Sequence, residues 1–325
     1  MLFIKNTRVA MSQLSFASLP LKNIKIRAQK FLDEMDQIIP WTKLVNIIEP
    51  HYPKAGNGRR PMNLIMMIKI HCLQQWYNLS DPAMEEAIYD RLSFQRFLKL
   101  DLMIDRVPDE TTILKFRHLL EKHKLAVQIF ATIANYLQSK GLLMKKGTIV
   151  DATIVASPSS TKNKEKKRDP EMSSTKKHGQ FYFGMKMHTG VDVDSGLVHS
   201  LEITTAKVCD IKMLPSLLHG EEWAVFGDKG YASDKDKHYA RDAEVYWGVL
   251  DKKKKNNPLS SKQKKRNRKL ASIRSKVEFP FLIIKRLWGH RKTRYRGLRK
   301  NLSQWHMLTA LSNLYQVRKK LRAMA

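Results

Sequence analysis

The hydrophobic periodicity of this chain changes near residue 145, and this change constrains the fold more than any other feature. Before it, apolar residues recur at helical spacing, as in Ile113, Phe116, Leu119 and Leu120. After it, β-branched and aromatic residues form short strand-like runs, beginning with residues 148–155 and 181–188. We therefore predict an all-α region followed by an α/β region with a mixed sheet flanked by helices.

The expected helical domain spans residues 1–140. Several of its short helices are joined by basic loops, such as the one that contains Arg59 and Arg60. Short helices with basic loops fit a helix-turn-helix-like DNA-binding module, and a plain helical bundle is the alternative. Met11 is a second plausible start of translation, which would make the preceding residues an upstream extension.

The charge balance predicts a polyanionic partner. Sixty Lys and Arg oppose thirty Asp and Glu, which gives a formal net charge of +30, and phosphates attract such a chain by counterion release. No apolar stretch reaches the roughly 18 residues of a membrane-spanning helix, so we expect no membrane association. Two distant cysteines exclude a disulfide framework and a zinc ribbon. We expect a cytoplasmic, nucleoid-associated protein.

The expected α/β domain spans residues 141–325. Its patterns run as three strands, a helix, a strand, a helix, a strand and a final helix. Two segments interrupt this order. Residues 157–177 lack periodicity and predict a mobile loop. Residues 251–270 carry ten Lys or Arg and predict a basic loop, which is either solvated or binds phosphates.

Three acids lie in unusual settings. Asp151 interrupts an apolar β-branched run, Asp228 ends a second apolar run, and Glu278 lies within a basic helix. A carboxylate inside a strand is costly unless it is compensated, and a divalent metal is a common compensation. Each acid also has a structural interpretation: a buried residue bound by backbone donors, a turn residue, and a surface acid paired with Arg274.

Together the acids predict a metal site. Two acids on strands of one sheet and one on a late helix can converge at the sheet's carboxyl edge and hold two Mg²⁺ ions, with Mn²⁺ as a substitute. Arg274, Glu278 and Lys285 recur at i, i+4 and i+11, which places them near one stripe of the helix. Cations on that stripe, with Lys229, are candidates for holding the phosphates of a DNA strand.

Trp288 is a further candidate DNA contact. It lies among basic residues beyond Glu278, and such a mixture of aromatic and basic residues can stack bases and pair phosphates. The alternative is an aromatic ring buried in the core with the cations outside.

These motifs carry a family resemblance. The segments Val150-Asp151-Ala152-Thr153 and Gly227-Asp228-Lys229-Gly230-Tyr231, with the spacing Arg274-x3-Glu278-x6-Lys285, resemble the DDE transposases of bacterial insertion sequences, group five in particular. The resemblance extends over most of the chain. It implies a ribonuclease H-like catalytic domain in which Asp151, Asp228 and Glu278 bind metal and catalyse cleavage.

The resemblance also implies partners and a reaction. The enzyme would cut double-stranded DNA at terminal inverted repeats and join the 3′-hydroxyl ends to target DNA, as a homodimer or larger assembly. A nuclease or resolvase of the same fold that never joins DNA is the alternative. A non-catalytic basic DNA- or RNA-binding protein is a third hypothesis, based on charge alone.

Overall fold

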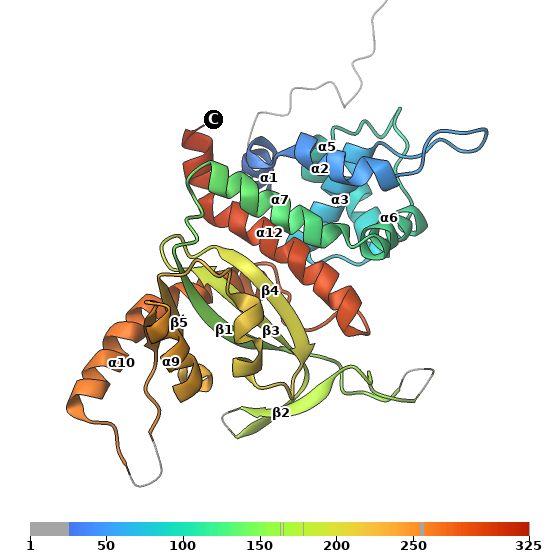
Figure 1. The fold of residues 1–325 in the computed structure, drawn as a ribbon. Helices are drawn as coiled ribbons and strands as arrows, with labels where there is room; N and C mark the ends of the chain where they lie inside the picture. Colours follow the sequence, from blue (N-terminus) through green and yellow to red (C-terminus); the bar gives the residue numbers. More distant parts are fainter. Residues whose placement is uncertain (1–25, 163, 165, 178, 254–256, 325) are drawn as a thin grey trace, which may run out of the picture.

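The computed structural model describes residues 26–324, except residues 163, 165, 178 and 254–256. The predicted α/β class is confirmed, because a helical region lies beside a mixed sheet that is flanked by helices (Figure 1). Met11 lies outside the described residues. None of the described helices is both long and apolar enough to cross a membrane.

Polar side chains cap the start of three α-helices in the helical region. Its elements are α1 (Arg27–Ile38), α2 (Trp41–Ile48), the 3-10 turn η2 (Glu49–His51), α3 (Leu64–Tyr77), α4 (Asp81–Asp90), α5 (Leu92–Leu98), α6 (Glu110–Lys122) and α7 (Leu125–Ser139). Asn63 caps α3 by accepting a hydrogen bond from the N–H of Met66 at 3.1 Å, and Asp109 caps α6 through the N–H of Thr112 at 2.7 Å. These caps fix where the helices start.

The sheet combines antiparallel and parallel pairing. Its strands are β1 (Gly147–Ala156), β2 (Ser173–Lys177), β3 (Gln180–Asp192), β4 (Val198–Thr205), β5 (Ala224–Gly227) and β6 (Tyr246–Val249). The order is β2-β3-β1-β5-β6, and β4 also pairs with β3. β1, β5 and β6 run parallel, whereas β3 is antiparallel to β1, β2 and β4. The parallel strands therefore end at one edge of the sheet.

Shorter helices follow the strands and lead to one long final helix. They are η3 (Asp210–Met213), α8 (Leu214–Leu217), η4 (Lys229–Tyr231), α9 (Asp234–Asp242), α10 (Ser261–Arg274), the 3-10 turn η5 (Ser275–Val277), α11 (Glu278–Leu282), the π-helix η6 (Ile283–Leu287) and α12 (Leu298–Ala323). α10, η5, α11 and η6 follow one another without a break, so they form one continuous helical segment.

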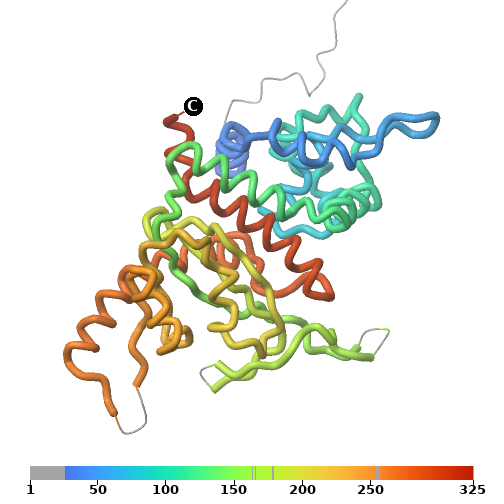
Figure 2. The backbone as a smooth tube through the Cα atoms, in the orientation of Figure 1, coloured from blue at the N-terminus to red at the C-terminus, as the bar shows by residue number. Residues whose placement is uncertain are grey.

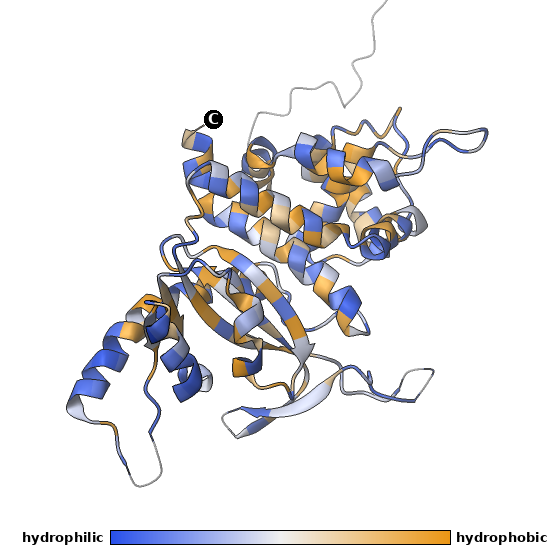
Figure 3. Cartoon of the chain, viewed as in Figure 1, coloured by the Kyte–Doolittle hydropathy of each residue, from blue (hydrophilic) through white to orange (hydrophobic). Residues whose placement is uncertain are grey.

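Both segments that were expected to be loops contain regular structure. Ser173–Lys177, within the expected mobile loop, is strand β2 and pairs with β3. Ser261–Arg274 is helix α10, so the expected basic loop is a helix over its second half. Figure 3 shows α10 as largely hydrophilic, which explains why an apolar pattern did not reveal it.

α12 belongs to both regions of the molecule. It packs against α1 and α7 on one side and against β4 on the other, and Figures 1 and 2 show it between the helical region and the sheet. Residues from Leu32 to Leu321 form one continuous hydrophobic cluster that includes strand residues such as Ile149. The predicted division at residues 140 and 141 is therefore not a division of the hydrophobic core.

Candidate active site

Asp151 and Asp228 lie at matching positions of two parallel strands. The register of β1 and β5 pairs Ile149 with Phe226. Asp151 and Asp228 each follow two residues later, so the two carboxylates lie at the same level of the sheet. Both strands are buried up to that point, which fixes the backbone that carries each acid. The structure thus brings two of the three predicted acids together.

The charge of Asp151 is incompletely compensated. Burial raises the pKa of Asp151 to about 6, and the charge of Asp228 acts in the same direction. Arg274 opposes this rise, with Nη2 at 3.7 Å from Oδ1 of Asp151. The arginine side chain is 17% exposed and that of Asp151 is 23% exposed. Carboxylate oxygens with residual negative charge are the ligands that Mg²⁺ prefers, so the donor set fits a divalent cation.

Asp228 also forms a turn, as its structural interpretation predicted. Its Oδ1 accepts a hydrogen bond from the N–H of Gly230 at 2.7 Å. Tyr231 follows, fully buried, and its hydroxyl makes no hydrogen bond within the described residues. Burial raises the pKa of Tyr231, and the charges of Asp210, Asp151 and Asp228 raise it further. A neutral phenol therefore lies close to the acids.

Asp210 is an acid that sequence reasoning missed. It accepts a hydrogen bond from Nζ of Lys186 at 3.0 Å and lies 3.9 Å from Nδ1 of His188. Lys186 and His188 pair with Ile154 and Ala152 of β1, so Asp210 lies on the face of the sheet opposite to Asp151. Its Oδ2 also lies near Gly230 of the Asp228 turn. Its position at the start of a predicted helix carried no functional signal.

Lys285 contacts β1 just beyond Asp151. Its Nζ donates hydrogen bonds to Oγ1 of Thr153 at 2.7 Å and to the carbonyl of Ile154 at 2.6 Å. Burial lowers the pKa of Lys285 to about 8, Lys177 acts in the same direction, and Asp151 opposes them. The lysine lies in the π-helix η6, a geometry that is frequent at functional sites.

Glu278 lies on the same helical segment but stands apart from the two aspartates. It is exposed and begins α11, four residues after Arg274. Within the described residues it has no hydrogen-bond or ion-pair partner, because Arg274 pairs with Asp151 instead. No three His, Cys, Asp or Glu side chains in the described part of the chain form a metal-binding group. The assignment of Glu278 as a metal ligand stays a prediction.

The predicted phosphate contacts outside this segment are exposed. Lys229 lies in η4, directly after Asp228. Arg59 and Arg60 lie in a loop that extends from the helical region, away from the sheet (Figure 1). They line a groove of about 310 Å³ with other cations, and Arg59 lies 3.7 Å from Asp109. This groove is a basic surface on the helical region.

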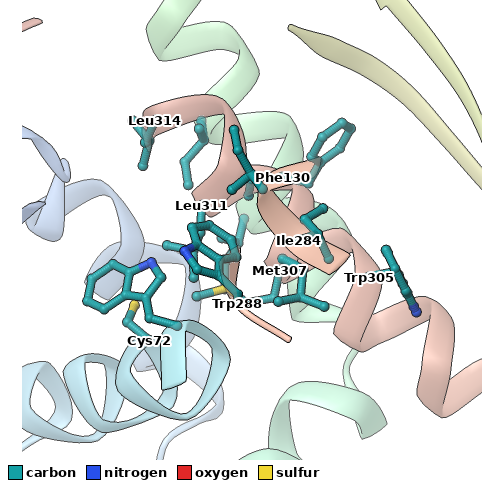
Figure 4. Close-up of a cluster of buried hydrophobic side chains, with 14 of the residues drawn as sticks. Cys72, Phe130, Ile284, Trp288, Trp305, Met307, Leu311 and Leu314 are labelled. Atoms are coloured by element: carbon teal, nitrogen blue, oxygen red, sulfur yellow. The ribbon is translucent and has the colours of Figure 1, made fainter. Parts of the chain in front are cut away.

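The prediction that Trp288 contacts DNA is wrong, because its ring is buried. It is 5% exposed and belongs to the hydrophobic core. Figure 4 shows its ring among Met307, Leu311 and Cys72, and it meets Tyr315 edge-on at 6.0 Å between centroids. Part of this cluster comes from Cys72 of α3, 216 positions earlier in the sequence, so the local pattern of aromatic and basic residues does not reveal the burial.

Comparison with protein families identifies the chain. Residues 143–314, more than half of its length, match the model of the transposase DDE domain. Residues 21–119 match a second model, which also describes a transposase domain. The mixed sheet flanked by helices is consistent with the ribonuclease H-like fold of a DDE domain. The chain belongs to the DDE transposase family, which is typical of bacterial insertion sequences.

Proposed function

We propose that the chain cuts DNA strands at the terminal inverted repeats of an insertion sequence and joins the 3′-hydroxyl ends to target DNA. The observation that carries this proposal is the meeting of Asp151 and Asp228 at matching positions of parallel strands. Arg274 and Lys285 contact the same strand, at Asp151 and just beyond it. Acids and cations thus line one path for a DNA backbone.

Asp151, Asp228 and Glu278 would hold the divalent ions, for which Mg²⁺ is the best match to an all-carboxylate donor set. When bound, such ions lower the pKa of the attacking hydroxyl and stabilise charge on the leaving oxygen. Because Glu278 is exposed and without a partner in the described chain, it can turn toward the aspartates without breaking a contact.

The basic residues would orient the DNA. Arg274 lies beside Asp151 and can exchange part of that contact for a phosphate, which a guanidinium binds through paired hydrogen bonds. Lys229 is exposed one residue after Asp228, where it can reach a neighbouring phosphate. A strand held at both points lies across the carboxylates, and such positioning is a large part of catalysis in phosphoryl transfer.

The helical region would recognise the terminal repeats. Its basic groove contains Arg59 and Arg60 with Lys54, Arg106 and Lys115, and phosphate contacts of this kind fix a protein on its duplex. Two ends must be held together before they are joined. We therefore infer that the active assembly contains at least two copies of the chain.

The triad assignment is tested by three single variants, Asp151→Asn, Asp228→Asn and Glu278→Gln. On labelled duplex DNA that contains a terminal repeat, each should lower the rate of Mg²⁺-dependent strand cleavage by at least about 10³-fold. This corresponds to an activation free energy that is higher by about 4 kcal/mol. Affinity for the same DNA should change little, because the repeat is held elsewhere.

Glu86→Gln is the matched control, because Glu86 is an exposed acid of α4 in the helical region. Normal cleavage by the Glu278→Gln variant would refute the assignment of that residue.

Pre-cut ends with free 3′-hydroxyls separate strand joining from strand cleavage. Joined product supports a transposase that transfers strands, whereas hydrolysis without joining identifies a nuclease.

A further inference from the structure

The C-terminal segment follows β1 beyond the two aspartates. Lys285 contacts Thr153 and Ile154. Further along, Lys292 forms an isolated parallel bridge with Ala156, the last residue of the strand. A path marked by two lysines therefore leads away from the acids along β1.

A basic pocket of about 320 Å³ lies where this path ends. One wall comes from the segment after β1, and the other comes from the segment before α12. The side chains in these walls that can bind an anion are Ser157, Lys162, Arg168, Thr293, Arg294 and Arg296. Four of these six carry a positive charge.

Hydrogen bonds hold the walls together. The N–H of Thr293 donates to the carbonyl of Ala156 at 2.8 Å, and its hydroxyl donates to Oγ of Ser157 at 3.1 Å. Nε of Arg168 donates to the carbonyl of Ser159 at 2.9 Å. The pocket is thus formed before any ligand arrives, which lowers the entropic cost of binding.

The pocket keeps its positive charge. It contains the carboxylate of Asp169, but this group accepts hydrogen bonds from the N–H of Glu171 at 3.1 Å and of Gly297 at 2.7 Å. Arg294 donates to Asn78, a neutral side chain, at 2.6 Å. The acid is thus held at the start of α12, and its single negative charge is outnumbered by the cations of the pocket. Lys162 is exposed and forms no ion pair within the described residues.

We propose that this pocket is a DNA subsite, which binds a phosphate of the strand that runs along β1 from the acids. Ser157 lies six positions after Asp151, which is about 20 Å of extended strand. Phosphates of one strand of B-form DNA recur about every 3.4 Å along the axis, so the bound phosphate lies within about six nucleotides of the reacting one. The inference rests on the proposed DNA-cleaving function.

Lys162→Gln tests the subsite. Lys162 is exposed and lines the pocket, so the variant removes one charge without disturbing the fold. DNA binding is measured by fluorescence anisotropy across a range of salt concentrations, with Ca²⁺ in place of Mg²⁺ to prevent cleavage. The slope of log affinity against log salt should become shallower by about 0.9, the value for one lost phosphate contact. Lys162→Arg should restore the slope.

Lys319→Gln is the matched control. Lys319 is an exposed lysine near the other end of α12, about 30 Å of helix away from the pocket. The salt slope of the Lys319→Gln variant should therefore equal that of the wild type. Equal slopes for Lys162→Gln and Lys319→Gln would overturn the subsite. If the wild type cleaves no DNA, the proposed function fails, while the slopes still report whether this pocket binds phosphate.

Shortened duplexes show on which side of the reacting phosphate the DNA phosphate bound in the pocket lies. One duplex lacks the DNA outside the element and the other lacks the first repeat nucleotides. The difference between Lys162→Gln and the wild type should vanish on one of these duplexes and persist on the other. A difference that persists on both would overturn the placement of the strand along β1.

Discussion

The acids near the end of β1 differ in what compensates their charge. Asp151 has a guanidinium at 3.7 Å, and Asp210 has an ammonium group at 3.0 Å. Glu278 has no partner within the described residues. The ammonium group of Lys186 holds Asp210 in place, whereas Glu278 is free to bind an incoming cation. This difference separates the structural role of Asp210 from the binding role that we propose for Glu278.

The ion pair of Asp210 with Lys186 should stabilise the fold. The two side chains are 28% and 14% exposed, and Lys186 also donates to the carbonyl of Val208 at 2.7 Å. In a double-mutant cycle with Asp210→Asn and Lys186→Met, urea unfolding should give a coupling free energy of about 1 kcal/mol. A coupling close to zero would show that the ion pair positions the two side chains but adds nothing to the free energy of unfolding.

The strands were predictable where burial imposes a pattern. β1 and β3 follow the β-branched and aromatic runs at residues 148–155 and 181–188. β2 was not predictable, because its residues Ser173–Lys177 are polar and lie at the end of the strand order. An edge strand of this kind is stabilised by backbone pairing with β3, which leaves no hydrophobic alternation in the sequence.

Helix α10 was also missed, although the sequence contains a signal for it. Ser260 and Gln263 form a capping box, with reciprocal hydrogen bonds of 2.9 Å and 3.2 Å. The density of positive charge predicted a basic loop instead. Charge density indicates only that a segment is solvated, whereas a capping box indicates where a helix starts. In this segment the capping box marks the observed start of α10.

Ser260→Ala should weaken the start of α10. Loss of an N-cap costs about 1 kcal/mol, so hydrogen exchange in the first turn of the helix should become about fivefold faster. Ser272→Ala, at an exposed position later in α10, should leave this exchange unchanged. Unchanged exchange in the Ser260→Ala variant would mean that packing alone determines the start of the helix.

The burial of α12 between the helical region and the sheet joins the molecule into one core. This arrangement could not be read from local pattern, because it depends on contacts such as that of Asn313 with Val198, which are 115 residues apart. The same long-range packing buries Trp288 and made its predicted role wrong. By contrast, the meeting of Asp151 and Asp228 followed from local pattern and strand topology.

Asn313 is the side chain through which α12 holds the sheet. It is fully buried, accepts a hydrogen bond from the N–H of Val198 at 3.0 Å and donates to the carbonyl of Val198 at 2.7 Å. Asn313→Ala leaves both backbone groups unpaired, which should cost about 2–4 kcal/mol of unfolding free energy. Ser312→Ala is the control, because the buried hydroxyl of Ser312 has no hydrogen-bond partner within the described residues.

The effect of Asn313→Ala should appear in both regions at once. Because the core is shared, the wild type should unfold in a single transition, and the variant should shift that transition without splitting it. A single-tryptophan protein that keeps Trp76 reports on the helical region, and one that keeps Trp247 reports on the sheet. If the midpoints of these two reporters separated in urea, the helical region and the sheet would be independent folding units, joined by α12 but not stabilised by it.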